Sequence, residues 1–340
     1  MLKGAVVGFG RMGLTHFSIL NSHPDVEFAA VCDSSSFMLK NIEKYTELKT
    51  FTSSVEMYEK VQPDFVIIAT PTSFHYGDVK EAVKRGIHTF VEKPFVLNVT
   101  EGEEITGMLN GNRLINQVGY VIRFNEIFVK IKQLINDGFI GKPLTYKMEM
   151  NGPTVSKPVK SGWRSKKSNG GGCLYDFASH SIDLINYLVG KPKKITGTIL
   201  KSIYSVNVED QITSTFIHDG NLSGTLMVNW SDTSYRKPAY KFELMGDRGK
   251  VIADMHAFKL FLNYEPSDGK YMKGWNNRYI TDFSRPVRFY LRGNEFTRQL
   301  DYFIDSIMGR TDGGMCTFND GLNANRVIEE IMEDNSYRNN

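Results

Sequence analysis

The chain has 340 residues, more than one typical core requires, so we expect two domains. Lysine and arginine total 41 against 38 acidic residues, and this net charge of +3 gives no reason to expect a nucleic acid or a membrane as partner. Cys32, Cys173 and Cys316 lack metal-ligand spacing, which predicts free thiols in a reducing compartment and no metal site. A strand begins close to Met1 and no apolar run reaches membrane length. We therefore expect no signal peptide, transit peptide or membrane span, and a cytoplasmic protein.

The first strand, at about residues 3–7, runs into a glycine-rich turn and then a helix. This turn consists of Gly8, Phe9, Gly10, Arg11, Met12 and Gly13. Gly8 allows a sharp turn, Gly10 lets a diphosphate approach the main chain, and Gly13 lets the helix lie close to the sheet. Asp33 ends a second apolar run 20 residues after Gly13, where a carboxylate can bind ribose hydroxyls. The pattern predicts a dinucleotide-binding site, the alternative being an ordinary tight turn.

The residue at the end of the second strand bears on the choice of cofactor. A carboxylate at Asp33 repels a 2′-phosphate, which favours NAD over NADP. The three serines that follow, Ser34 to Ser36, are small enough to accommodate a phosphate, and Lys40 lies a few residues further on. We therefore predict NAD and keep NADP as the alternative.

Short apolar runs and helical patterns alternate up to about residue 121, which predicts a doubly wound α/β domain with a parallel sheet. The run at 64–69 is apolar on both faces, as a strand covered by helices on both sides requires. The other elements expected here are a helix ending at Gly86, a strand at 88–94, a helix at 100–110 and a strand at 115–121. We predict a dinucleotide-binding Rossmann domain at residues 1–121.

After an amphipathic helix at 126–137, most segments alternate apolar and polar residues and are joined by short turns. The strands expected are at 144–150, 195–203, 211–218, 222–230, 240–246, 250–254 and 259–264, followed by helices at 294–308 and 319–333. Short links favour antiparallel neighbours, so we predict an α+β domain at residues 122–340 with a large, open, mainly antiparallel sheet. Its uncovered face would seek a second copy, and we expect a homodimer or homotetramer formed through this sheet.

Three motifs occur in order along the chain. They are the glycine turn at 8–13, the turn Glu92-Lys93-Pro94 after a strand, and the run 170–183 that contains Asp176 and His180. Together they resemble the glucose-fructose oxidoreductase, inositol dehydrogenase and rhizopine-catabolism (Gfo/Idh/MocA) family of NAD(P)-dependent sugar oxidoreductases, over nearly the whole chain. Cys173 and Ala178 depart from the pattern, since the family more often has Ala and Gly at these places.

Lys93 follows a strand of the predicted parallel sheet, at the edge where ligands of such sheets bind. An ammonium group there can hydrogen-bond a substrate hydroxyl and stabilise the negative charge that develops on its oxygen as hydride leaves. The resemblance implies this role, implies that Glu92 and Lys93 also line the cofactor site, and implies that the bond before Pro94 is often cis. The alternative is a surface lysine paired with Glu92.

Asp176, His180 and Asp183 follow one another at intervals of four and three residues, so on a regular helix they project from one face. Here His180 can take the proton of a substrate hydroxyl, Asp176 can accept a hydrogen bond from the neighbouring hydroxyl, and Asp183 can orient the imidazole. Glycines 170–172 would give this helix a flexible entry. The resemblance implies that Lys93, Asp176 and His180 are the catalytic residues. The alternatives are a solvated helix face and a metal site, which would need a further ligand from elsewhere.

By resemblance, Thr70, Pro71 and His75 line the cofactor site at another strand end. The alternative for this stretch is a helix cap at Thr72 or Ser73.

Two further pairs are candidate substrate-binding residues. By resemblance, Tyr120 and Arg123 open the linker between the domains near the substrate, although Arg123 is also suited to pairing with a surface acid. Trp163 and Arg164 lie in a basic loop, where one can stack on a sugar ring and the other can hold an anionic group. The alternative is a solvated mobile loop. The lysines of this loop are Lys157, Lys160, Lys166 and Lys167.

The pattern as a whole predicts an NAD(P)-dependent oxidoreductase that interconverts a secondary alcohol and a ketone on a sugar, a sugar derivative or an inositol. Two alternatives remain. One is a glycosidase of the same architecture that recycles its bound NAD through a transient ketone. The other is a non-catalytic regulator that senses a sugar or a nucleotide.

Overall fold

The computed structural model describes residues 1–158, 162–267 and 269–338. The chain forms two compact units. The first comprises Met1–Val121 and Pro286–Asn325, and the second comprises Ile122–Arg285 and Arg326–Asn340. This division differs from the predicted one, which placed all residues after 121 in a second domain.

The first unit is built on a six-stranded parallel sheet. Its strands are β1 (Leu2–Val7), β2 (Val26–Cys32), β3 (Lys49–Phe51), β4 (Phe65–Ile68), β5 (His88–Val91) and β6 (Asn116–Val118). Their order in the sheet is β3-β2-β1-β4-β5-β6, so the chain starts in the middle and builds outward on both sides. This doubly wound order confirms the predicted Rossmann-type fold.

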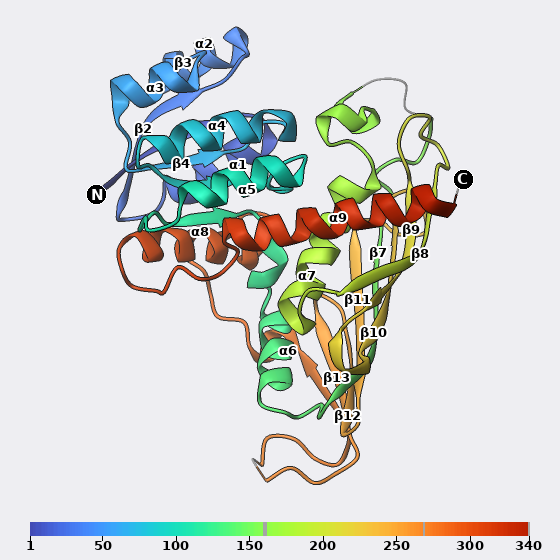
Figure 1. Ribbon diagram of the computed structural model, residues 1–340. Coiled ribbons are helices and arrows are strands. Elements are labelled where there is room, and N and C mark those ends of the chain that lie inside the picture. The colour runs from blue at the N-terminus through green and yellow to red at the C-terminus, as the bar shows by residue number, and fades with distance from the viewer. Residues whose placement is uncertain (159–161, 268, 339–340) are drawn as a thin grey trace. The chain divides into compact units, whose positions relative to one another are not determined.

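Helices pack around this sheet in two groups (Figure 1): α1 lies against α8, while α3, α4 and α5 lie side by side. The helices of the unit are α1 (Arg11–Leu20), α2 (Ser36–Tyr45), α3 (Ser54–Val61), α4 (Thr72–Lys84), α5 (Val99–Met108), α8 (Asn294–Ile307) and the first turns of α9 (Phe318–Arg338). Three of them start at a capping side chain, because Ser35, Ser53 and Asn98 each accept a hydrogen bond from a main-chain N–H of the first turn.

Helix α8 completes the core of the first unit, although most of the chain lies between it and the strands it covers. It contributes Leu300, Phe303 and Ile304 to that core. The Phe303 ring packs edge-on against two strand residues, with its centroid 6.0 Å from that of Phe65 and 5.9 Å from that of Phe90.

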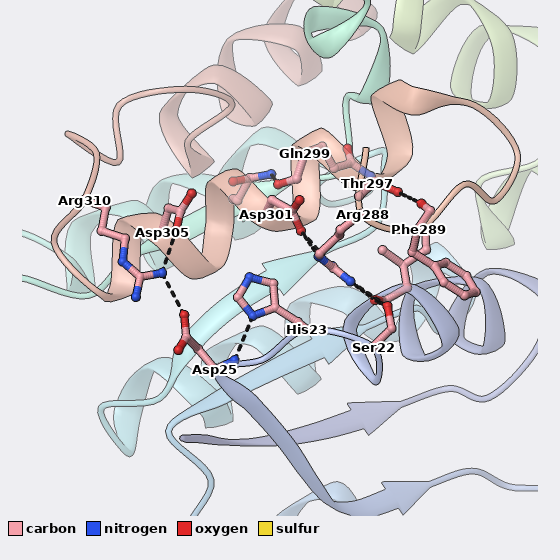
Figure 2. Close-up of polar contacts among 12 residues, drawn as sticks. Ser22, His23, Asp25, Arg288, Phe289, Thr297, Gln299, Asp301, Asp305 and Arg310 are labelled. Atoms are coloured by element: carbon pink, nitrogen blue, oxygen red, sulfur yellow. Dashed lines mark hydrogen bonds and ion pairs between the residues drawn. The ribbon is translucent and has the colours of Figure 1, made fainter. Parts of the chain in front are cut away.

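Polar contacts also attach the returning segment to the first unit (Figure 2). Arg288 donates from Nη1 to the carbonyl oxygen of Ile19 over 2.7 Å and from Nε to Asp301 over 2.8 Å. Arg310 bridges Asp25, over 2.7 Å, and Asp305, over 3.1 Å. These contacts join residues as far as 285 positions apart, which is why local patterns assigned the segment to the second domain.

The second unit contains an eight-stranded sheet. Its strands are β7 (Pro143–Asn151), β8 (Lys194–Lys201), β9 (Gln211–Ile217), β10 (Ser223–Asn229), β11 (Ala239–Gly246), β12 (Gly249–Ala253), β13 (Ala257–Leu262) and β14 (Gly274–Tyr279). They lie in the order β14-β13-β12-β11-β7-β10-β9-β8, and all neighbours are antiparallel except β7 and β10. The predicted open, mainly antiparallel sheet is confirmed, with β14 as an unforeseen edge strand.

Helices lie against one face of this sheet, where α7 packs on β7 and on α6 (Figure 1). In β7 the buried face carries Tyr146, Met148 and Met150, whereas Thr145 and Lys147 are exposed. The helical elements of the unit are η1 (Val121–Phe124), α6 (Glu126–Asn136), η2 (Trp163–Ser165), η3 (Lys167–Asn169), η4 (Leu174–Ala178), α7 (Ser179–Val189), η5 (Asp219–Asn221), η6 (Ile280–Asp282) and the later turns of α9. None of the helices in the described ranges combines the length and apolar character needed to cross a bilayer.

Candidate active site

The carboxyl edge of the parallel sheet gathers the predicted cofactor residues. The last paired residues of four neighbouring strands are in register: Cys32, Val7, Ile68 and Val91. The residues that follow them, and so leave the sheet at this one edge, are Asp33, Gly8, Ala69 and Glu92. Ligands of open parallel sheets bind beyond this edge.

Close approach requires two of the glycines in the turn. Gly8 has a φ of +85°, and a Cβ at this position would lie 2.7 Å from the main chain of Ala69 and Thr70. A Cβ on Gly13 would collide with the carbonyl oxygen of Gly8. Gly10 instead faces open space, with nothing within 4 Å of its Cβ position, just before α1 begins. This uncovered main chain beside a helix N-terminus fits a dinucleotide diphosphate.

Main-chain groups hold Asp33 in place at the end of β2. Its Oδ2 accepts a hydrogen bond from the Phe9 N–H over 2.6 Å, and its Oδ1 accepts one from the Ser35 N–H over 2.8 Å. Each carboxylate oxygen can accept a further hydrogen bond, such as one from a ribose hydroxyl. Arg11 and Met12, the remaining predicted residues of the turn, begin α1, and Arg11 is exposed.

Glu92 interacts with α1 and with the start of its own turn. Its Oε1 lies 2.7 Å from Nε2 of His16, and its Oε2 accepts a hydrogen bond from the Lys93 N–H over 3.1 Å. Burial alone would raise the pKa of Glu92, but the His16 hydrogen bond and the charges of His16 and Lys93 hold that pKa below its usual value. The Lys93-Pro94 bond is cis, as the resemblance implied.

His75 supports the same turn from α4. Its Nδ1 faces the carbonyl oxygens of Pro94, at 2.9 Å, and Phe95, at 3.3 Å, while its Nε2 faces that of Thr70, at 2.9 Å. Burial lowers the pKa of His75, and these carbonyl oxygens oppose that shift. Both ring nitrogens of His75 thus face main-chain carbonyl oxygens, and its place in the wall of the cofactor site stays a prediction. The Thr70 hydroxyl donates to Asp78 over 3.2 Å. Pro71 is exposed ahead of α4.

In the second unit, the helix predicted to carry the reacting groups starts irregularly. Leu174–Ala178 form a π-helical turn, η4, and α7 begins only at Ser179. Asp176 therefore lies in the π-helical turn and His180 in the regular helix, and the common face of the two side chains stays a prediction. Asp176 is 8 % exposed and His180 is half-buried.

Arg164 reaches across to Asp176. Its Nε donates to Oδ2 of Asp176 over 2.9 Å, and its guanidinium lies 4.4 Å from the centre of the Trp163 ring. The Trp163-Arg164 pair and Asp176, which the sequence identified separately, therefore lie together. Of the basic loop, Lys166 and Lys167 are exposed beside them and Lys157 is also exposed, while Lys160 lies outside the described residues.

Close packing, in place of the expected flexibility, explains the glycines before η4. Gly172 has a φ of +102°, and a Cβ on it would collide with the Glu209 carboxylate. Glu209 in turn accepts a hydrogen bond from the Leu174 N–H over 2.8 Å. Burial raises the pKa of Glu209, against the effect of that hydrogen bond. Sequence reasoning missed Glu209, whose only signal is an acidic pair ahead of a strand.

Asp183 binds an arginine. Both of its oxygens accept hydrogen bonds from Arg123, over 2.9 Å from Nε and 2.6 Å from Nη2, and both side chains are buried. This pairing joins η1 to α7, and the orientation of His180 by Asp183 stays a prediction. Tyr120, the other predicted linker residue, is 1 % exposed and belongs to the first unit.

The candidate residues thus form two groups, one in each unit. The glycine turn, Asp33 and the Glu92-Lys93 turn belong to the first unit, and Trp163, Arg164, Asp176 and His180 belong to the second. Within the described residues, no cluster of three or more His, Cys, Asp or Glu side chains is arranged to hold a metal ion.

Comparison with known proteins relates the chain to sugar and cyclitol dehydrogenases. Two scyllo-inositol 2-dehydrogenases of Bacillus subtilis (strain 168) are similar: the NADP(+) enzyme is 26 % identical over 58 % of this chain, and the NAD(+) enzyme is 31 % identical over 56 % of it. These alignments span only about half of the relatives, 55 % and 54 % of their lengths. A solved levoglucosan dehydrogenase, in complex with NADH and levoglucosan, has the same fold, with a TM-score of 0.84 at 18 % identity over 99 % of this chain and 97 % of that one.

Family models match both parts of the chain. The model described as "Oxidoreductase family, NAD-binding Rossmann fold" matches residues 2–120, and that of the "GFO/IDH/MocA C-terminal domain" matches residues 128–252. Both models carry the name of one family, and together they match most of the chain. The chain therefore belongs to the Gfo/Idh/MocA oxidoreductase family.

Proposed function

We propose that this protein is an NAD(P)-dependent dehydrogenase that interconverts a secondary alcohol and a ketone on a sugar, a sugar derivative or an inositol. The observation that carries this proposal is the single sheet edge at which the glycine turn, Asp33 and the Glu92-Lys93 turn all leave the strands. Family membership and the inositol dehydrogenases among the relatives support the substrate class.

The first unit would hold the cofactor. The main chain around Gly10 and the start of α1 would bind the diphosphate, and Asp33 would accept the ribose hydroxyls. Two main-chain N–H groups fix the orientation of the Asp33 carboxylate. A 2′-phosphate at this place would be repelled by the carboxylate, which favours NAD over NADP. When bound, NAD supplies the nicotinamide carbon that accepts a hydride.

Three side chains would act on the substrate. His180 would take the proton from the hydroxyl oxygen, and the ammonium group of Lys93 would stabilise the negative charge on that oxygen as the hydride leaves. Asp176, whose orientation Arg164 fixes, would accept a hydrogen bond from the neighbouring hydroxyl. In the reverse direction His180 returns the proton to the oxygen of the ketone.

Other residues would contribute to substrate binding. The Trp163 ring, 38 % exposed, offers a face on which a sugar ring can stack, and the guanidinium beside it suits an acidic or hydroxyl-rich substituent. For Tyr120 and Arg123 the family resemblance remains the argument for a place near the substrate. Because Arg123 is 4 % exposed and holds Asp183, it would act by shaping the site.

A second copy of the chain is the partner we propose for the exposed face of the eight-stranded sheet. Met227 and Met245, 38 % and 43 % exposed, lie on that face together with Lys147, as the register of β10, β7 and β11 requires. The molar mass of the protein particle in solution, measured on the full chain, distinguishes a monomer from a dimer and a tetramer.

The test of the reaction is a screen of inositols, hexoses, sugar acids and nucleotide sugars with NAD, read as NADH absorbance. On the best substrate, His180→Ala should lower kcat by about two to four orders of magnitude while NADH still binds. The control is His256→Ala, which changes an exposed histidine of the same unit and should keep full turnover. Equal turnover of both variants would exclude His180 from the reaction.

The same screen separates the two alternatives. Release of a free sugar without net NADH formation would indicate a glycosidase that recycles its cofactor. Binding of NAD and a sugar, measured by isothermal titration, without any product would indicate a sensing protein.

A further inference from the structure

His16 is a buried histidine that contacts the turn carrying Lys93. It lies on α1, is 0 % exposed, and its ring packs edge-on against Phe90, with the centroids 5.1 Å apart. Its Nε2 lies 2.7 Å from Oε1 of Glu92. Its Nδ1 has no hydrogen-bond partner among the described residues, so the proton of a neutral ring belongs on Nε2, where it is donated to Glu92.

Glu92, which His16 contacts, also binds the main chain of Lys93. While Oε1 is held by His16, Oε2 accepts the main-chain N–H of Lys93 over 3.1 Å. On the far side, a Cβ on Gly119 would lie 3.2 Å from the Glu92 carboxyl atoms, so the end of β6 closely confines the carboxylate. The carboxylate therefore has one orientation, and that orientation fixes the first residue of the turn.

Four titratable groups face the Glu92 carboxylate. His16 approaches from α1, Lys93 from the turn itself, His75 from α4 and Arg292 from the segment before α8. With these groups present Glu92 stays ionised despite its burial, and an ionised carboxylate is a stronger acceptor for the Lys93 N–H than a protonated one.

We propose that His16 is a positioning residue for Lys93: it orients Glu92, and Glu92 holds the main chain from which the Lys93 side chain extends. The inference rests on the proposed function of Lys93. It extends that function to a helix residue that touches neither substrate nor the reacting atoms. His75 holds the following residues of the turn through the carbonyl oxygens of Pro94 and Phe95, so Glu92 is the contact by which His16 controls Lys93.

The activity test compares three variants of the full chain. In His16→Leu the donor is lost, burial then dominates the Glu92 pKa and raises it, and kcat should fall by about 10- to 100-fold with its acid limb moved to higher pH. In His16→Gln an amide N–H replaces Nε2–H, and both kcat and the acid limb should move back toward the parent values. The control is His88→Gln, at the opposite end of β5, which should leave the acid limb unchanged.

A second readout does not depend on turnover. Amide hydrogen exchange at Lys93, followed by NMR or mass spectrometry, should be faster in His16→Leu than in the parent, in His16→Gln and in His88→Gln. Unchanged Lys93 exchange together with an unmoved acid limb would overturn the role of His16 and leave the dehydrogenase proposal intact. Absence of turnover with every substrate, with faster Lys93 exchange in His16→Leu, would instead count against the dehydrogenase proposal alone.

Discussion

The guanidinium of Arg123 and the carboxylate of Asp183 form a two-point ion pair inside the second unit. The two side chains are 5 % and 2 % exposed. Parallel N–H···O bonds fix direction as well as distance, so the pair aligns η1 with α7. Loss of either partner leaves the other group charged and buried, which costs more than loss of both.

Asp183→Asn should therefore lower the free energy of unfolding by about 3–5 kcal/mol, measured by urea denaturation. The double variant Arg123→Met with Asp183→Leu should lose less unfolding free energy than Arg123→Met and Asp183→Leu lose in sum. In the double variant neither charge remains buried alone. Additive losses would contradict a coupled pair.

At the residue scale, sequence reasoning succeeded where a short pattern marks the site. Gly8, Gly13 and Asp33 could be identified from the spacing of the glycines between a strand and a helix, although the main chain that Gly8 approaches, at Ala69 and Thr70, is distant in sequence. The partners of Asp183 and Glu92 could not, since Arg123 and His16 are 60 and 76 positions away. For Asp183 the helical spacing to His180 pointed to a nearer partner.

Helices α4 and α5 cover the same sheet, but their glycines have different surroundings. Nothing lies within 4 Å of the Cβ position of Gly77 in α4, whereas a Cβ on Gly102 in α5 would lie 2.9 Å from the Leu322 side chain. Gly77→Ala should raise the free energy of unfolding by about 0.5–1 kcal/mol, since alanine reduces the freedom of the unfolded chain without a clash. Gly102→Ala is the matched change and should gain less or lose stability in the same urea titration. Equal gains would show that the contact with Leu322 is soft.

At the scale of elements, strands with regular patterns were predicted well. The alternation of apolar and polar residues located β7 and β9 to β13, and the wholly apolar run located β4. The edge strand β14 was missed because its sequence, Trp275-Asn276-Asn277-Arg278, lacks that alternation. The π turn η4 was missed because the apolar spacing of Leu174–Ala178 is also compatible with a regular α-helix.

Buried and half-buried histidines in both units make the stability of the whole molecule sensitive to acid. His23 and His88 each accept a main-chain N–H on Nδ1, over 3.1 Å from Asp25 and 2.9 Å from Ile115, and a proton on that nitrogen would break the bond. Burial lowers the pKa of His23, of His88 and of His218 from the usual 6.5. Around His23 the positive charge of Arg288 adds to this effect, against the carboxylates of Asp25, Asp301 and Asp305 (Figure 2).

The sign of the pH effect follows from these lowered pKa values. The unfolded chain takes up protons near pH 6.5 and the folded chain resists, so the histidines stabilise the fold above pH 6.5 and lose this contribution as the pH falls below it. Each histidine can change the free energy of unfolding by up to about 1.4 kcal/mol per pH unit in this range. His23→Asn keeps an acceptor for the Asp25 N–H but cannot be protonated, so its unfolding free energy should fall less steeply between pH 6.5 and 5. A slope equal to that of the parent would contradict the assignment.

At the scale of the molecule, composition and the order of the motifs were enough to predict two domains, the fold of each, and their order along the chain. The division of the chain was not predictable, because the segment Pro286–Asn325 is held in the first unit by core contacts and by Arg288 and Arg310, all of them distant in sequence.

This discontinuity governs how the protein must be made. During translation the strands bearing Phe65 and Phe90 leave the ribosome long before Phe303, the residue that covers them, has been synthesised. Until then the nascent polypeptide exposes apolar rings to solvent, the condition in which incomplete chains aggregate and chaperones bind. The amino-terminal half therefore cannot mature ahead of the rest, and both halves finish folding only after elongation passes α8.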